Sequence, residues 1–346
     1  MPFGGLAALL QSLAGSPLEA LSLAVGEVLW IPGAPGMGSW LEALPSLHSL
    51  HIESSMPPTL LSPASTLAQL SSLTFLSLSQ TSHLEPFVLP PALLPPRLAV
   101  LQLAGTDARG GPLSLDPLPP TLRQLHLSNP ATGLPEDSLA RLPSLQGRSS
   151  LGLEGCRLTW VPRQVSTLTT LQELSLAGNP GIGPHFANPL YLRALTRLSK
   201  LDLSGCLLAS ISPGVVGLPG LKDLRLAGNQ LRCPSPLLPG GVGLEYLSLD
   251  LAVAFRWQVH LVAMPSLQTL KLTSPMQQGE CRCVVYGAGP LAGHDDEAMP
   301  GQVGRDPVVD ALSRLPAMRE GAARCKLRLS GDLGYLLGLS TMEAVA

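Results

Sequence analysis

Leucine recurs along this chain in the six-residue pattern L-x-x-L-x-L, which returns every 23 to 29 residues. Leu171, Leu174 and Leu176 form one representative copy, and Arg148 takes the first place of another. The second and third leucines of a copy are two residues apart, so both side chains point to one face of a strand. The pattern stays in phase over eleven copies, which begin at residues 18, 47, 73, 98, 122, 148, 171, 198, 221, 244 and 267. It predicts short parallel strands whose leucines pack on those of the neighbouring copies.

The residues that follow each strand indicate a turn. With the first leucine counted as position 1, Asn179 and Asn229 stand at position 9 of their copies, and Cys156 and Cys206 take the same position in two others. An asparagine side chain can hydrogen-bond to the backbone of its own bend. We therefore assign these four residues a structural role.

Together these features give the pattern L-x-x-L-x-L-x-x-N/C-x-L, which resembles the leucine-rich-repeat family. The segment LTWVPRQVSTL at 158–168 is similar to the 23-residue repeat class that is typical of intracellular members. The resemblance covers residues 18–280 and implies an α/β solenoid, with a curved parallel sheet on its concave side and an irregular or helical convex side. A single repeat cannot bury its own apolar face, so the array should fold as a unit.

Both ends of the chain depart from the pattern. We interpret residues 1–17 as a partial N-terminal repeat and 281–346 as an irregular C-terminal cap or tail with a flexible loop at 287–306. Lys326–Leu329 is a candidate last strand. The N-terminal region has no polar cap, and Glu19 is its first charged residue. This favours missing upstream sequence over a partner that covers the edge.

Composition and charge exclude several classes of function. Hydrophobic residues make up 45% of the chain and aromatic residues only 4%, so leucine does most of the core filling. The 22 Lys and Arg against 24 Asp and Glu give a net charge of −2, and no basic run occurs. Nucleic-acid binding and polybasic membrane contact both need concentrated positive charge, so neither is expected. We identify no membrane-spanning segment.

No combination of residues indicates catalysis, a metal or a cofactor. Cys281, Cys283 and Cys325 lack the spacing of a zinc site. His51 and His126 share a strand position but lie three repeats apart, roughly 14 Å, which is too far to bind one metal ion. We expect a non-enzymatic protein whose six cysteines are free thiols. A disulfide from Cys325 to Cys281 or Cys283 is the alternative.

The concave face is the candidate binding surface. Its residues are small and neutral in the first half of the array and charged in the second. Stacking in register should place Glu173, Lys200 and Asp223 side by side at position 3, and Asp202 beside Arg225 at position 5. The candidate binding residues are Glu173, Lys200, Asp202, Asp223, Arg225, Tyr246, Ser248, Asp250 and Lys271. The alternative interpretation is a ladder of charges that neutralise one another.

The sequence predicts a monomeric scaffold that binds a protein partner in the cytoplasm. The family resemblance implies partners among cytoskeletal, ciliary-axonemal, signalling or ubiquitin-ligase components, with association with the axoneme as the alternative location. An extracellular or receptor-like recognition module is a second hypothesis. The sequence contains no N-x-S/T glycosylation sequon, which counts against it. A third is the repeat region of a longer F-box adaptor or kinase.

Overall fold

A computed structural model was obtained for the full chain of 346 residues. The structure describes residues 12–25, 41, 44–54, 65–80, 94–105, 118–128, 134, 140, 142–145, 147–186, 190–232, 243–256, 264, 266–273 and 326–330.

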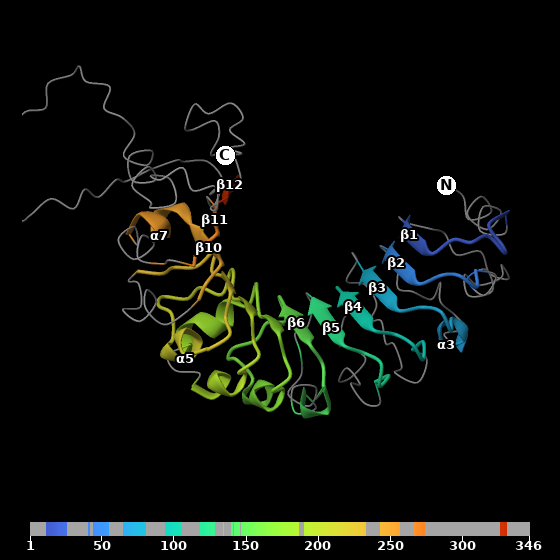
Figure 1. The fold of residues 1–346 in the computed structure, drawn as a ribbon, viewed down its shortest axis with the longest axis horizontal. Coiled ribbons are helices and arrows are strands. Elements are labelled where there is room, and N and C mark those ends of the chain that lie inside the picture. The colour runs from blue at the N-terminus through green and yellow to red at the C-terminus, as the bar shows by residue number, and fades with distance from the viewer. Residues whose placement is uncertain are drawn as a thin grey trace, which may run out of the picture.

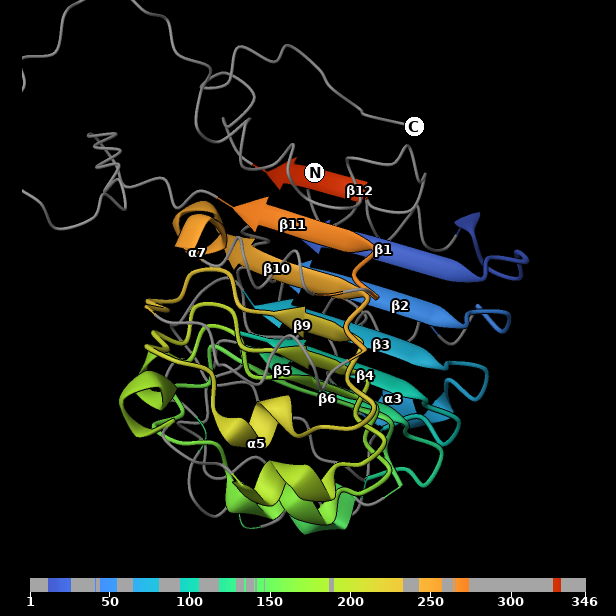
Figure 2. The same cartoon turned by 60° about the vertical axis from the view of Figure 1, so that its left-hand side comes forward.

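Within the described residues one parallel sheet of twelve strands forms the frame of the molecule, and the strands follow one another in chain order. Figure 1 shows the sheet curved into an arc with its strands on the inner side, and Figure 2 shows the strands lying side by side. The strands are β1 (Ala20–Val25), β2 (Ser49–Ser54), β3 (Phe75–Gln80), β4 (Val100–Ala104), β5 (Gln124–Ser128), β6 (Ser150–Glu154), β7 (Glu173–Ser175), β8 (Lys200–Asp202), β9 (Asp223–Arg225), β10 (Tyr246–Asp250), β11 (Thr269–Thr273) and β12 (Lys326–Ser330).

The leucines stack in register along the whole sheet. Leu174 pairs with Leu151 on one side and with Leu201 on the other, and the same position remains aligned from β1 to β12. Leu201 is fully buried. The buried residues form one continuous core, because each strand covers the leucines of its neighbours.

Short helical turns cover the convex side. They are α3 (Ser65–Gln69), the 3₁₀ turns η4 (Leu142–Leu145), η5 (Arg163–Thr167), η6 (Pro180–His185) and η7 (Leu190–Ala194), and the helices α5 (Pro213–Val216) and α7 (Leu251–Arg256). Pro213 stands at the start of α5, where the Ser212 hydroxyl accepts a hydrogen bond from the Gly214 N–H at 3.1 Å. Val215 of this helix is buried against the core. Such turns place aliphatic side chains, including Leu142, Val165, Ile182 and Val215, behind the sheet.

Glycine allows the turn at the end of the strands. Five glycines at position 8 have positive φ angles of +59° to +71°, a backbone region that favours glycine: Gly105, Gly155, Gly178, Gly205 and Gly228. Gly183 has another role, because a Cβ atom at this residue would overlap the carbonyl of Leu207 in the next repeat. The repeats are thus in close backbone contact at this edge.

The fold agrees with the predicted α/β solenoid. All eleven predicted copies contribute a strand, and Lys326–Leu329 belongs to β12, which pairs in register with β11. The sheet therefore extends into residues 281–346, the predicted C-terminal cap or tail. Residues 1–11 and the predicted loop at 287–306 lie outside the described residues.

Candidate binding surface on the concave face

The charged residues of the second half form the predicted columns. Glu173, Lys200 and Asp223 are register partners at position 3 of β7, β8 and β9. Asp202 of β8 is the register partner of Arg225 in β9 at position 5. Alternation along each strand turns these side chains away from the leucine core and onto the inner face of the arc.

One ion pair joins β7 and β8 across the sheet. The Lys200 ammonium lies 3.6 Å from a carboxylate oxygen of Glu173, with side chains 36% and 46% exposed. Solvent screens a pair as open as this, so its contribution to stability is small. Both groups remain accessible to a second molecule.

Arg225 has a better-defined environment than Lys200. Its guanidinium forms two hydrogen bonds to the Asp223 carboxylate, at 3.2 Å and 3.0 Å, and lies 5.2 Å from the ring centre of Tyr246 in β10. The hydrogen bonds to Asp223 raise the pKa of Arg225. The predicted neighbour Asp202 instead accepts a hydrogen bond from the Ser204 N–H at 2.9 Å. Arg225 is therefore held between a carboxylate and an aromatic ring, with its side chain 35% exposed.

Two of the predicted binding residues are buried, which corrects their placement on the accessible surface. Ser248 is 4% exposed and Asp250 is 6% exposed. The Asp250 carboxylate accepts hydrogen bonds from the N–H groups of Gly228 and Asn229, at 2.9 Å and 3.1 Å. In the earlier repeats a main-chain carbonyl accepts the equivalent bond, as Ala227 does from Gly205. Asp250 thus completes a backbone turn, and neither residue is available to a partner.

The four residues at position 9 form a hydrogen-bond ladder along the sheet. Each donates to the carbonyl of the third leucine of the preceding repeat: Cys156 Sγ to Leu127 at 3.4 Å, Asn179 Nδ2 to Leu153 at 2.8 Å, Cys206 Sγ to Leu176 at 3.1 Å and Asn229 Nδ2 to Leu203 at 2.8 Å. The asparagines also bond to their own turn, as expected. The ladder ties five consecutive repeats together, from the copy that holds Leu127 to the copy that holds Asn229.

The cysteines of the ladder are free thiols and are buried. Burial raises the pKa of Cys156 to about 12 and that of Cys206 to about 11. Both therefore stay protonated at neutral pH and are poor nucleophiles or metal ligands. The other four cysteines lie outside the described residues.

The first half of the concave face carries a histidine in a compact setting. His126 packs over Gly152, where a side chain would overlap its ring, and its Nε2 atom lies 3.2 Å from the Ser150 hydroxyl. Desolvation lowers the pKa of His126, against the opposing effect of Glu154 and Glu173. His51 is three strands away along the same column, as predicted. Within the described residues no group of three metal-binding side chains occurs.

The register of β12 extends the concave face beyond the predicted residues. Lys326 aligns with Thr269 at position 3, and Arg328 aligns with Lys271 at position 5. The sequence predicted this strand, but Lys326 and Arg328 were not included among the candidate binding residues at positions 3 and 5. The alternation Lys-Leu-Arg-Leu was the signal that would have done so.

The part of the chain described by the structure contains no helix with the length and apolar character needed to cross a bilayer. A helix that spans a bilayer needs about twenty consecutive, mainly apolar residues.

Comparison with known proteins identifies the class of fold. No protein-family model and no curated protein matches the chain. Matching solved structures include the crystal structure of a TLR13–ssRNA13 complex, at 20% sequence identity and a TM-score of 0.50. The match covers 78% of this chain but only 37% of that one. TLR13 is a leucine-rich-repeat protein, and the likeness concerns the fold alone. This chain is an α/β leucine-rich-repeat solenoid.

Proposed function

We propose that the chain is a non-enzymatic scaffold that binds a protein partner on the concave face of its second half. The repeat solenoid supports a role as a binding module. The observation that carries the location is the triad of Asp223, Arg225 and Tyr246. Arginine and tyrosine are enriched among the residues that dominate protein interfaces, and a side chain already held in place loses little entropy on binding. Glu173, Lys200 and Asp202 extend the surface with charges that select the orientation of a partner.

Ser248 and Asp250 are left out of this surface because both are buried. Lys271 stays in it, because its side chain is only partly buried at position 5 of the copy that forms β11. The proposed location is cytoplasmic, with the axoneme as the alternative, and rests on the resemblance of residues 158–168 to intracellular repeats.

The RNA in the TLR13 complex is a ligand of that protein. The net charge of −2 gives no support for an RNA ligand here.

Affinity capture with the full chain tests the proposed surface. Arg225→Glu should reduce recovery of a captured partner about tenfold or more, because it reverses a charge at the centre of the triad. Tyr246→Ser should do the same without any change in charge. Arg123→Glu is the matched charge reversal, since Arg123 is exposed directly before β5 in the first half. Gln102→Glu tests the concave face of the first half.

The pattern of losses decides the location. Loss with Arg225→Glu and Tyr246→Ser, but with neither control, supports the proposed surface. Loss with Gln102→Glu alone would place the site in the first half. Ser77 is unsuitable as a control there, because it is 6% exposed and a glutamate would disturb the core. Melting curves of all four variants separate lost binding from lost folding.

A further inference from the structure

Acidic and basic side chains are segregated between the two sides of the solenoid over residues 142–222. The three carboxylates of this stretch, Glu154, Glu173 and Asp202, all belong to strands of the concave sheet. Of its seven Lys and Arg residues, only Lys200 lies in a strand. The other six lie outside the strands: Arg148, Arg157, Arg163, Arg193, Arg197 and Lys222. Outside the strands, residues 142–222 therefore contribute basic side chains to the surface and no acidic ones.

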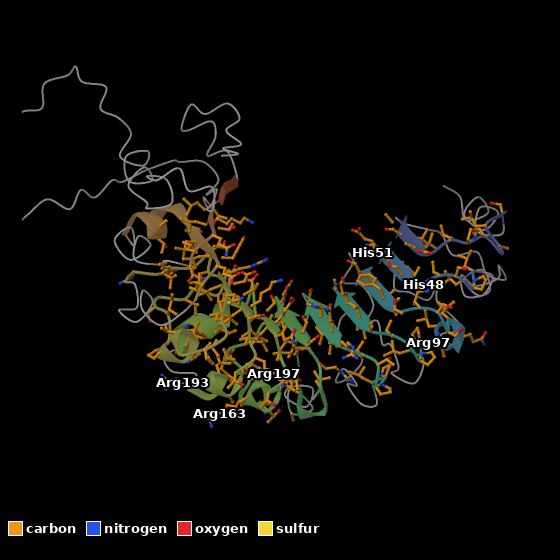
Figure 3. The ribbon with its side chains drawn as sticks, viewed as in Figure 1. His48, His51, Arg97, Arg163, Arg193 and Arg197 are labelled. Carbon is orange, nitrogen blue, oxygen red and sulfur yellow. The ribbon has the colours of Figure 1, made fainter. Side chains whose placement is uncertain are left out.

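Two of these cations lie in neighbouring helical turns of the convex side, and a third lies in the turn that follows them. Arg163 begins η5, Arg193 lies within η7, and Arg197 follows it in the turn that leads into β8. η5 and η7 pack against each other, and all three side chains are exposed. Figure 3 shows Arg163 and Arg193 on the outer side of the arc, away from the strands. The three residues are named the convex arginine cluster.

The cluster has a defined support on one side. A Cβ atom at Gly217, directly after α5, would lie 2.8 Å from Nε of Arg193. The guanidinium of Arg193 thus rests against α5, and the glycine leaves room for it. Contact with a second element restricts the side chain and lowers the entropy that binding must remove.

We propose that the convex arginine cluster binds a short acidic segment of a protein partner. Guanidinium groups form paired hydrogen bonds with carboxylates, and no carboxylate from residues 142–222 competes for them on this side. Complementary charge then favours the encounter and sets the orientation of the bound segment. This surface lies on the opposite side of the sheet from the proposed concave site, so the two are independent.

The charge balance favours a short peptide over a longer polyanion or a membrane. The whole chain has a net charge of −2, so the positive potential is local to the cluster. A nucleic acid would extend beyond the three arginines, so few of its phosphates would contact a cation. Recognition of anionic lipid by basic clusters takes about four to eight Lys or Arg residues, more than the three present here.

Fluorescence anisotropy with the full chain tests this proposal. The probe is a labelled peptide of alternating glutamate and glycine, at low ionic strength. The triple variant Arg163→Gln, Arg193→Gln, Arg197→Gln should weaken binding roughly tenfold, since exposed charge pairs contribute a few-fold each. The matched control Arg97→Gln, Arg123→Gln, Arg232→Gln removes the same charge from exposed residues elsewhere and should weaken it less than about twofold. Thermal melts establish that both variants fold.

Each further outcome counts against the proposal. Equal weakening by the two triple variants would mean that net charge alone attracts the peptide. If the unmodified chain shows no measurable peptide binding, the proposed site is wrong. A single-stranded oligonucleotide and vesicles containing phosphatidylserine are tested in parallel. If either binds more tightly than the peptide and depends more on the cluster, the ligand class is wrong.

Discussion

The side-chain amide of Asn229 donates a hydrogen bond to the carbonyl oxygen of Leu203, one repeat earlier, over 2.8 Å. The same amide donates to Leu226 in its own turn, also at 2.8 Å, and its Oδ1 accepts from the N–H of Leu208 at 2.9 Å. Asn229 is buried, so water cannot replace these bonds. One side chain therefore closes its own turn and that of the preceding repeat, which couples the folding of the two.

Replacing this asparagine should be costly. Asn229→Ala leaves several buried backbone groups without partners, each of which costs about 1–3 kcal/mol. After partial relaxation we expect a loss of on the order of 3 kcal/mol in the free energy of unfolding. The measurement is the urea midpoint, with the slope checked for a change in cooperativity.

The neighbouring residue provides the control. Gln230 is exposed, and its N–H donates to Leu208 from the backbone, so Gln230→Ala keeps that bond. Its effect should stay within about 0.5 kcal/mol. Asn229→Cys should be intermediate, because Cys206 occupies the same position with its Sγ on a carbonyl. Equal midpoints for Asn229→Ala and Gln230→Ala would mean that the ladder contributes nothing to stability.

Gly183 should tolerate no side chain. A Cβ atom there would overlap the Leu207 carbonyl and lie 2.6 Å from the carbonyl oxygen of Cys206. Gly183→Ala should therefore destabilise the chain by roughly 1–3 kcal/mol, the usual cost of overpacking. Gly243→Ala is the matched change, since nothing lies within 4 Å of its Cβ position. Differential scanning calorimetry should show a lower melting temperature for the first variant only.

The repeat pattern predicted the register because a slip of one residue would turn every leucine of a strand to the other face. It could not choose the partner of Arg225, since Asp202 and Asp223 both lie beside it and side-chain rotamers decide between them. It also missed the burial of Asp250. After Asp250 the chain enters α7 instead of a glycine turn, and the carboxylate takes the place of a main-chain carbonyl. Leu251 at position 8, where five other copies have glycine, was the available signal.

A charge in the leucine column should disrupt the whole array. Leu201 is 0% exposed and is flanked by Leu174 and Leu224, so Leu201→Asp buries a carboxylate without a partner. We expect a loss of at least about 3 kcal/mol and a broadened unfolding transition, because both neighbouring repeats lose their contacts. Circular dichroism against temperature measures this. Ser210→Asp places the same group at an exposed residue and should leave the melting curve unchanged.

The buried thiols should make stability depend on pH in the alkaline range. Folding raises the pKa of Cys156 and Cys206 from 9.0 to about 12 and about 11. Between pH 9 and 11 the unfolded chain therefore releases thiol protons that the folded chain keeps. The stabilisation is fully present below pH 9 and declines as pH rises through this window.

The double variant Cys156→Asn, Cys206→Asn isolates this contribution. Asparagine already occupies the same position in two repeats, so the variant should fold, and it lacks both titrating thiols. Its urea midpoint should fall less steeply between pH 9 and 11 than that of the unmodified chain. Lysine and tyrosine ionise in both proteins, so the difference between the two profiles reports the thiols alone. Parallel profiles would show that the two cysteines ionise equally in the folded and unfolded states, in which case the thiols are not buried as the ladder requires.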